Sequence, residues 1–170
     1  MFHNIMIPLH KVQTSPLYFQ QLMRCTMLFL TKDRSLAIPL LEGILKYWPF
    51  ANYQKEMMFL AELLETIECS NIDQMQHIVP KLYKRVLRCI DGSNLHVTDR
   101  AMCFFENDYF LSLTSTYKDV TYPILVPTIV ELSEKHWHKI LQESVQAIQK
   151  ILKDINPQAF DAALKLSEAE

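Results

Sequence analysis

The sequence predicts an all-α protein, because its apolar residues recur with the helical period and its glycines are scarce. Only 2 glycines occur, where average usage would give about 12 in a chain of this length. Apolar positions alternate between steps of three and four residues, as in Tyr53, Met57, Leu60, Leu64 and Ile67. No segment shows the two-residue alternation of a half-buried strand. We therefore expect helices that pack through these apolar stripes along the whole chain.

Prolines within apolar stretches divide the chain at a recurring pitch. Pro8, Pro39, Pro80 and Pro127 are each flanked by aliphatic residues and recur at intervals of roughly 30 to 50 residues, which is typical of repeated helix pairs. The proline-bearing helices are expected near residues 4–10, 36–48, 72–90 and 118–133. Their partner helices are expected near residues 16–31, 53–68, 95–114 and 137–154.

The partner helices begin about 40 residues apart, and this pitch fits repeats of the HEAT type. The predicted fold is therefore a HEAT-like α-solenoid of about four antiparallel helix pairs. No low-complexity linker interrupts the pattern, so residues 1–170 are predicted to form one domain. The first predicted helix is short, so we expect either a part of a longer solenoid or a solenoid with a truncated first repeat.

Capping residues indicate where several helices begin. Ser35 is expected to cap the second proline-bearing helix, and Asn52 the helix that follows it, because both side chains can accept from free backbone N–H groups. Asn156 and Pro157 predict the start of a final short helix.

Two of the predicted helices contain an interruption. Pro80 lies in the middle of residues 72–90, so it is expected to kink that helix by freeing the carbonyl group of Gln76. Polar residues interrupt the apolar stripe of residues 95–114 at Asn107 and Asp108, where we expect that helix to break.

Charge and cysteine spacing exclude several classes of protein. The net charge is −2, from 17 Lys and Arg against 19 Asp and Glu, whereas proteins that bind duplex nucleic acid carry a basic excess.

The 4 cysteines form no C-x-x-C pair, so neither a disulfide framework nor a zinc site is expected. We interpret them as buried, reduced thiols of a cytoplasmic or nuclear protein. No apolar run reaches the roughly 20 residues that cross a bilayer, so no membrane partner is expected.

The candidate catalytic and metal-binding residues do not have the spacing of a known type of site. His136 and His138 lie two apart and would point about 200° away from each other on a helix, so they cannot share an ion there. Trp137 between them is interpreted as a packing anchor. Glu62 and Glu65 are interpreted as part of a solvated helix face. Because no nucleophile elbow or glycine-rich loop occurs either, we expect a protein that is not an enzyme and needs no cofactor.

One helix carries a basic stripe. Lys81, Lys84, Arg85 and Arg88 lie on one face of the Pro80 helix. Two interpretations stay open: a solvated helix face, or a docking surface for an acidic partner.

Several segments resemble, in the same order, the B-prime family of regulatory subunits of protein phosphatase 2A. They are Pro-Leu-His-Lys-Val at 8–12, Leu-Lys-Tyr-Trp-Pro at 45–49, Lys-Glu-Met-Met-Phe-Leu-Ala-Glu-Leu at 55–63, Arg-Ala-Met-Cys-Phe-Phe-Glu-Asn-Asp-Tyr at 100–109, Lys-His-Trp-His-Lys at 135–139 and Asn-Pro-Gln-Ala-Phe-Asp at 156–161. The resemblance implies a non-catalytic HEAT-like subunit that joins the phosphatase scaffold and catalytic subunits and directs the choice of substrate proteins.

Members of this family are more than twice as long, and the chain resembles their C-terminal half. The family's pocket for Leu-x-x-Ile-x-Glu motifs lies in earlier repeats, so no residue of that pocket is carried over. The resemblance implies contact with the catalytic subunit through loops within helix pairs, here 49–52, 92–94 and 134–136. The candidate partner-binding residues are Asn52, Lys84, Arg85, Ser93, Lys135 and His136.

The sequence departs from the family pattern at two places. Residues 50–53 lack the usual Ser-Pro helix start, and Phe105 stands where a tryptophan is usual. The alternative functions are a generic HEAT-repeat adaptor with unrelated protein partners and a HEAT-fold nucleic-acid glycosylase. The glycosylase needs a basic concave face, which the net charge of −2 disfavours.

Overall fold

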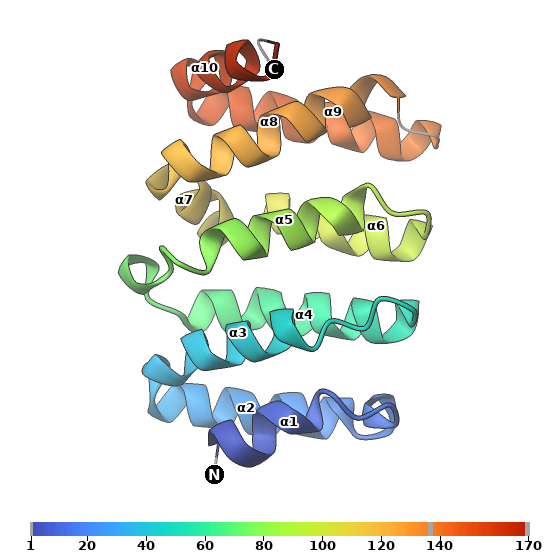
Figure 1. Ribbon diagram of the computed structural model, residues 1–170, viewed down its shortest axis with the longest axis vertical. Coiled ribbons are helices and arrows are strands. Elements are labelled where there is room, and N and C mark those ends of the chain that lie inside the picture. The colour runs from blue at the N-terminus through green and yellow to red at the C-terminus, as the bar shows by residue number, and fades with distance from the viewer. Residues whose placement is uncertain (1, 136–137, 169–170) are drawn as a thin grey trace. The chain divides into compact units, whose positions relative to one another are not determined.

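The computed structural model describes residues 2–135 and 138–168, and every regular element within these ranges is a helix (Figure 1). The helices form two compact units, Met1–Ile78 and Val79–Glu170. The predicted all-α class and HEAT-like helix pairs are confirmed. One domain across residues 1–170 stays a prediction.

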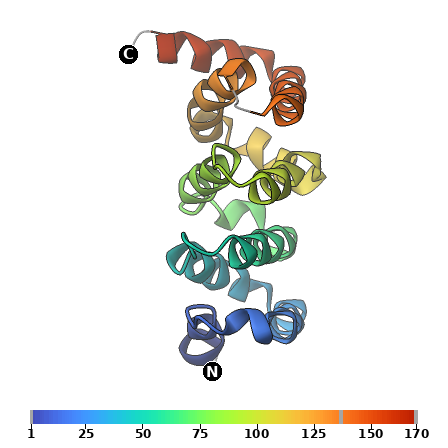
Figure 2. The same cartoon turned by 90° about the vertical axis from the view of Figure 1, so that its right-hand side faces the viewer.

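The first unit contains two helix pairs in two layers. Its helices are α1 (Ile7–Leu9), preceded by the π-turn Phe2–Met6, α2 (Phe19–Lys32), α3 (Ala37–Lys46) and α4 (Tyr53–Cys69). Short 3₁₀ turns lie at Ser15–Leu17, Arg34–Leu36 and Ile72–Gln74. Helix α1 packs on α3 and α2 packs on α4, which gives the two columns visible end-on in Figure 2.

The core of the first unit is centred on Phe59 of α4, which is fully buried. Its ring stacks on Phe19 at a centroid distance of 5.9 Å, and Trp48 meets it edge-on at 5.8 Å. Leu40 and Ile44 of α3 are also fully buried. Each such side chain contributes roughly 1.5–3 kcal/mol relative to an exposed one, so these apolar stripes hold α2, α3 and α4 together.

The second unit also contains two helix pairs, with two further helices. Its elements are α5 (Val79–Ile90), α6 (Leu95–Met102), the 3₁₀ turn Cys103–Glu106, α7 (Asp108–Thr116), α8 (Lys118–Lys135), α9 (Lys139–Ile155) and α10 (Pro157–Glu168). The pairs are α5 with α6 and α8 with α9. Helix α8 packs on α5 and α9 on α6, while α10 lies against α8 and α9 (Figure 2).

A buried tyrosine organises the centre of the second unit. Tyr83 of α5 stacks on Phe110 of α7 at 4.6 Å between ring centroids, and its hydroxyl lies 2.7 Å from the Oγ1 atom of Thr114. Burial raises the pKa of Tyr83 far above its usual range, so the phenol stays protonated. Phe105 is also buried and meets Phe110 edge-on, as expected for a residue that replaces another aromatic.

The predicted kink at Pro80 is wrong. Residues 72–90 do not form one helix, because the 3₁₀ turn Ile72–Gln74 ends well before α5 begins at Val79. Pro80 is therefore the second residue of α5, where a backbone N–H would have no partner within the helix. The proline starts a helix here and breaks no hydrogen bond to Gln76.

Three of the four predicted helix boundaries are confirmed. Asn52 accepts a hydrogen bond from the backbone N–H of Lys55 at 3.0 Å, and Asn156 accepts one from Ala159 at 2.9 Å. The break at Asn107 is also present, since α7 begins directly after it.

The predicted Ser35 cap is wrong. Asp33 is the capping residue and accepts hydrogen bonds from both the backbone N–H and the hydroxyl of Ser35, at 3.0 and 2.6 Å. The Asp33 carboxylate, two residues before Ser35, caps the 3₁₀ turn Arg34–Leu36 and accepts both donors, so the serine hydroxyl is not needed as the cap.

The contact between α1 and α3 predicts the effect of Gly43→Ala. A Cβ atom at Gly43 would lie far inside contact distance of the Cγ2 atom of Ile7. Alanine favours the helix by up to about 1 kcal/mol, but overpacking costs about 1–3 kcal/mol. We expect a net destabilisation of about 1–2 kcal/mol in urea unfolding followed by circular dichroism.

The background Ile7→Ala provides the control, because it removes the obstructing methyl group. In that background Gly43→Ala should be neutral or stabilising. The same destabilisation in both backgrounds would show that the contact between α1 and α3 does not determine how Gly43→Ala changes the free energy of unfolding.

Candidate partner-binding surface

The loop at 47–52 joins α3 to α4 and is fixed at both ends. The indole N–H of buried Trp48 donates to the Oε1 atom of Glu56 at 2.8 Å, and Asn52 caps α4. Between these anchors Phe50 is 71% exposed, and Tyr53 at the start of α4 is 47% exposed. The loop therefore presents aromatic side chains on a rigid base, and aromatic residues dominate the binding energy of many interfaces.

The structure assigns the predicted site residue Asn52 to helix capping, although the side chain is exposed. The residue of this loop best suited to bind a partner is Phe50, which the sequence analysis does not single out. A signal for it is present, because phenylalanine directly after Trp-Pro lies in a turn, outside any apolar stripe.

Ser93 lies in the loop between α5 and α6, and both ends of this loop are also fixed. Asn94 caps α6 by accepting from the backbone N–H groups of His96 and Val97 at 3.1 and 3.2 Å. The hydroxyl of Thr98 donates to the carbonyl oxygen of Cys89 at the end of α5, at 3.1 Å. Ser93 is exposed between these anchors, as expected of a contact residue.

The predicted residues at the end of α8 are described only in part. Lys135 is exposed, and its Nζ atom lies 3.5 Å from the Oε1 atom of Glu131, one helical turn earlier. His136 and Trp137 lie outside the described residues, so their roles stay predictions. Within the second unit, the end of α8 and the α5–α6 loop lie at the same edge (Figure 1).

Lys84 and Arg85 do not lie in a loop. They belong to the basic stripe along α5, with Lys84 exposed and Arg85 half-buried. The structure therefore separates the predicted site residues into loop positions and one helix face.

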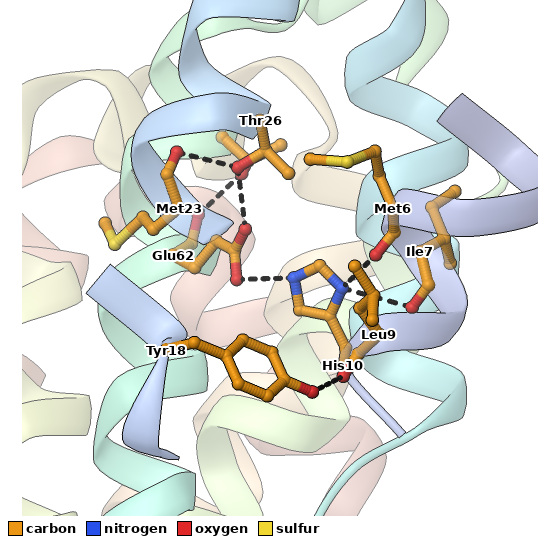
Figure 3. A network of polar contacts seen from close by, with 9 residues as sticks. Met6, Ile7, Leu9, His10, Tyr18, Met23, Thr26 and Glu62 are labelled. Carbon is orange, nitrogen blue, oxygen red and sulfur yellow. Dashed lines mark hydrogen bonds and ion pairs between the residues drawn. The ribbon is translucent and has the colours of Figure 1, made fainter. Parts of the chain in front are cut away.

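A buried polar network lies in the first unit, and no local sequence pattern predicts it. Glu62 is fully buried in α4, not on a solvated face as predicted, whereas Glu65 is exposed. Its Oε2 atom lies 2.9 Å from the Nε2 atom of His10, and the hydroxyl of Thr26 donates to its Oε1 atom at 3.0 Å (Figure 3). The network thus joins the end of α1 to α2 and α4.

The hydrogen-bond partners of His10 place a hydrogen on its Nδ1 atom. Its Nδ1 atom faces the carbonyl oxygens of Met6 and Ile7 at 3.0 and 3.1 Å, and since these only accept, Nδ1 carries a hydrogen. Burial lowers the pKa of His10, but the hydrogen bond and charge of Glu62, with the two carbonyl groups, outweigh burial and leave the pKa raised. A charged imidazolium paired with the Glu62 carboxylate satisfies every contact.

Two further contacts fasten the segment between α1 and α2. The ammonium group of Lys55 on α4 donates to the carbonyl oxygen of Val12 at 2.9 Å, and burial lowers the pKa of Lys55. The hydroxyl of Tyr18 donates to the carbonyl oxygen of Leu9 at 3.0 Å (Figure 3). This segment lies at the same edge of the first unit as the α3–α4 loop (Figure 1).

The described residues offer no assembled metal site, because no three His, Cys, Asp or Glu side chains among them come together. All four cysteines are free, but Cys25 is exposed and only Cys89 is buried, so the predicted burial of the thiols is wrong in general. Among the described helices, none combines the length and apolar character required to span a bilayer.

Comparison with known proteins identifies the family. The model of the family described as "Protein phosphatase 2A regulatory B subunit (B56 family)" matches residues 1–170. The chain belongs to the B56 family. This confirms the resemblance to B-prime subunits, and the family is one of regulatory rather than catalytic subunits. The match supports neither the generic adaptor nor the glycosylase.

Relatives in this family come from fungi, plants and animals. The chain is 36% identical over 158 residues to the phosphatase 2A 56 kDa regulatory subunit delta 1 isoform of Schizosaccharomyces pombe, covering 93% of this chain and 29% of that protein. It is 33% identical to the B' delta isoform of Arabidopsis thaliana (95% and 34%) and 33% identical to the 56 kDa alpha isoform of Homo sapiens (98% and 34%). The chain thus spans about a third of the length of these B56 relatives.

The His10–Glu62 pair predicts a dependence of stability on pH. Because the folded-state pKa of His10 is raised, its stabilising contribution is fully present below the unfolded-state pKa of about 6.5. It is lost as the pH rises through the folded-state pKa. We expect Glu62→Gln to destabilise the protein most near pH 6 and progressively less toward pH 9, by urea unfolding.

His96→Gln is the control, because His96 is exposed and lies on α6, so this variant should keep the pH profile of the unmodified chain. A constant difference between Glu62→Gln and the unmodified chain across this range would contradict a charged His10.

Proposed function

We propose that the chain is a regulatory part of protein phosphatase 2A that binds the scaffold–catalytic core and directs that enzyme toward substrate proteins. Membership of the B56 family along the whole chain is the observation that carries this proposal. The loops within helix pairs are the proposed contact surface, since the two described ones, between α3 and α4 and between α5 and α6, carry exposed residues and are held at both ends.

The proposed mechanism is positional rather than chemical. A regulatory subunit that holds a substrate near a catalytic subunit raises the local substrate concentration, and effective concentrations in the millimolar range accelerate the reaction without any new catalytic group. Holding a substrate at a fixed place favours a regulatory subunit whose binding loops are carried by a stiff set of helices. The buried network around Glu62 and the caps at Asn52 and Asn94 provide stiffness next to the loops.

Phe50 is the proposed centre of the contact in the first unit. A phenylalanine side chain has only two rotatable bonds, so it loses little entropy on binding and more of its burial contributes to affinity. Ser93 and Lys135 contribute polar contacts at the rim, where each interaction is weaker.

Titration of the phosphatase scaffold–catalytic dimer with the full chain tests this function. Binding with a dissociation constant in the micromolar range or weaker is expected, because the chain covers only part of a family member and a partial interface loses most of its free energy to association entropy. No binding at about 100 μM would contradict the proposal.

Phe50→Ala should weaken this binding at least about fivefold. Leu28→Ala is the matched control, because Leu28 is 63% exposed in the same unit but lies on α2, away from the loops. Equal affinities for both variants would exclude Phe50 from the interface.

A further inference from the structure

The exposed face of α5 is entirely basic, apart from Pro80. Lys81, Lys84 and Arg88 are exposed and Arg85 is half-buried, while every other residue of the helix except Pro80 is buried. The spacing of three, four and seven residues from Lys81 places the four cations on one face, and α5 contains no acidic residue.

Ion pairs within the unit do not neutralise the three exposed cations of this face. Lys81, Lys84 and Arg88 form no ion pair with another described residue of the unit. Helix α8 packs on α5, yet its residues from 120 to 130 carry no charge. Helix α6 also packs on α5, but its only acid, Asp99, lines a hollow with α9 residues.

The dimensions of the face limit the size of a ligand. From Lys81 to Arg88 the helix rises about 10 Å, at 1.5 Å per residue. An extended peptide advances about 3.3 Å per residue, so about four consecutive residues cover the face. The cations lie within about one Debye length of each other, so they act together on a ligand.

We propose that the basic face of α5, formed by Lys81, Lys84, Arg85 and Arg88, is a docking site for an acidic protein segment, a run of about four to six Asp or Glu residues. This goes beyond the proposed binding of the phosphatase core, because the surface is a helix face outside the loops. Carboxylates match it chemically, since ammonium and guanidinium groups both donate charge-assisted hydrogen bonds to them.

The remaining composition of the face favours protein over other polyanions. It carries no aromatic side chain on which a base could stack and no large apolar side chain that could enter a bilayer. The chain as a whole has a net charge of −2, so a long polyanion that extends beyond the stripe gains no further attraction.

Fluorescence anisotropy with a fluorescein-labelled hexaglutamate peptide, flanked by Gly-Ser, tests the proposal on the full chain. We expect saturable binding at about 50 mM NaCl that weakens severalfold at about 300 mM, because salt screens exposed charges. The corresponding hexaglutamine peptide should not bind. Lys81→Glu with Lys84→Glu should weaken binding at least about tenfold.

Lys150→Glu with Lys153→Glu is the matched control. These two lysines are exposed, share the three-residue spacing and lie on α9 of the same unit, so the double variant has the same net charge. It should bind within about twofold of the unmodified chain. Lys84→Gln with Arg88→Gln gives a second test that neutralises charge without reversing it, and circular dichroism verifies that each variant is folded.

Three results would overturn the proposal. The first is equal weakening by the α5 and α9 double variants, which would indicate net charge alone. The second is no binding of hexaglutamate at about 1 mM. The third is α5-dependent binding of duplex DNA, a phosphopeptide or phosphatidylserine vesicles without binding of hexaglutamate, which would assign the face to another class of ligand.

Discussion

The carboxylate of Glu62 lies in the packed interior of the first unit, and its two oxygens have separate partners on other elements. His10 after α1 pairs with one oxygen, and Thr26 of α2 donates to the other. Removing one partner of a buried ion pair typically costs about 3–5 kcal/mol, because the remaining charge stays desolvated. The network therefore specifies how the end of α1 and helices α2 and α4 meet, and a shifted packing would leave a buried charge unpaired.

In the second unit, two buried tyrosine hydroxyls form neutral hydrogen bonds. The Tyr83 hydroxyl contacts Thr114, and the Tyr122 hydroxyl donates to the carbonyl oxygen of Leu152, which ties α8 to α9. Such neutral hydrogen bonds contribute about 1 kcal/mol each, but they require the correct partner at the correct depth. The described buried networks of the two units thus differ in chemistry: an ion pair with a histidine in the first, and hydroxyl groups in the second.

Rigid helix pairs are the structural basis of the proposed regulatory role. In repeat proteins each pair contacts mainly its neighbours, and binding residues are carried by the loops and exposed faces that the pairs present. The loop with Phe50 is held by Trp48 and Asn52, whereas the basic residues of α5 project from a helix anchored by Tyr83. The proposed core contact and the proposed acidic docking site therefore use different residues and different structural supports.

The sequence by itself determined the all-α class, the helix pairs and the caps at Asn52 and Asn156, because helical period and capping depend on residues within about four positions of each other. It also identified the basic face of α5, which requires only helical geometry. The tertiary structure alone decided that Glu62 is buried against His10, 52 residues away, since no local pattern reports that distance. The structure also decided that α5 begins at Val79 rather than near residue 72, because the helical spacing of apolar residues continues across the 3₁₀ turn Ile72–Gln74 and does not reveal the break.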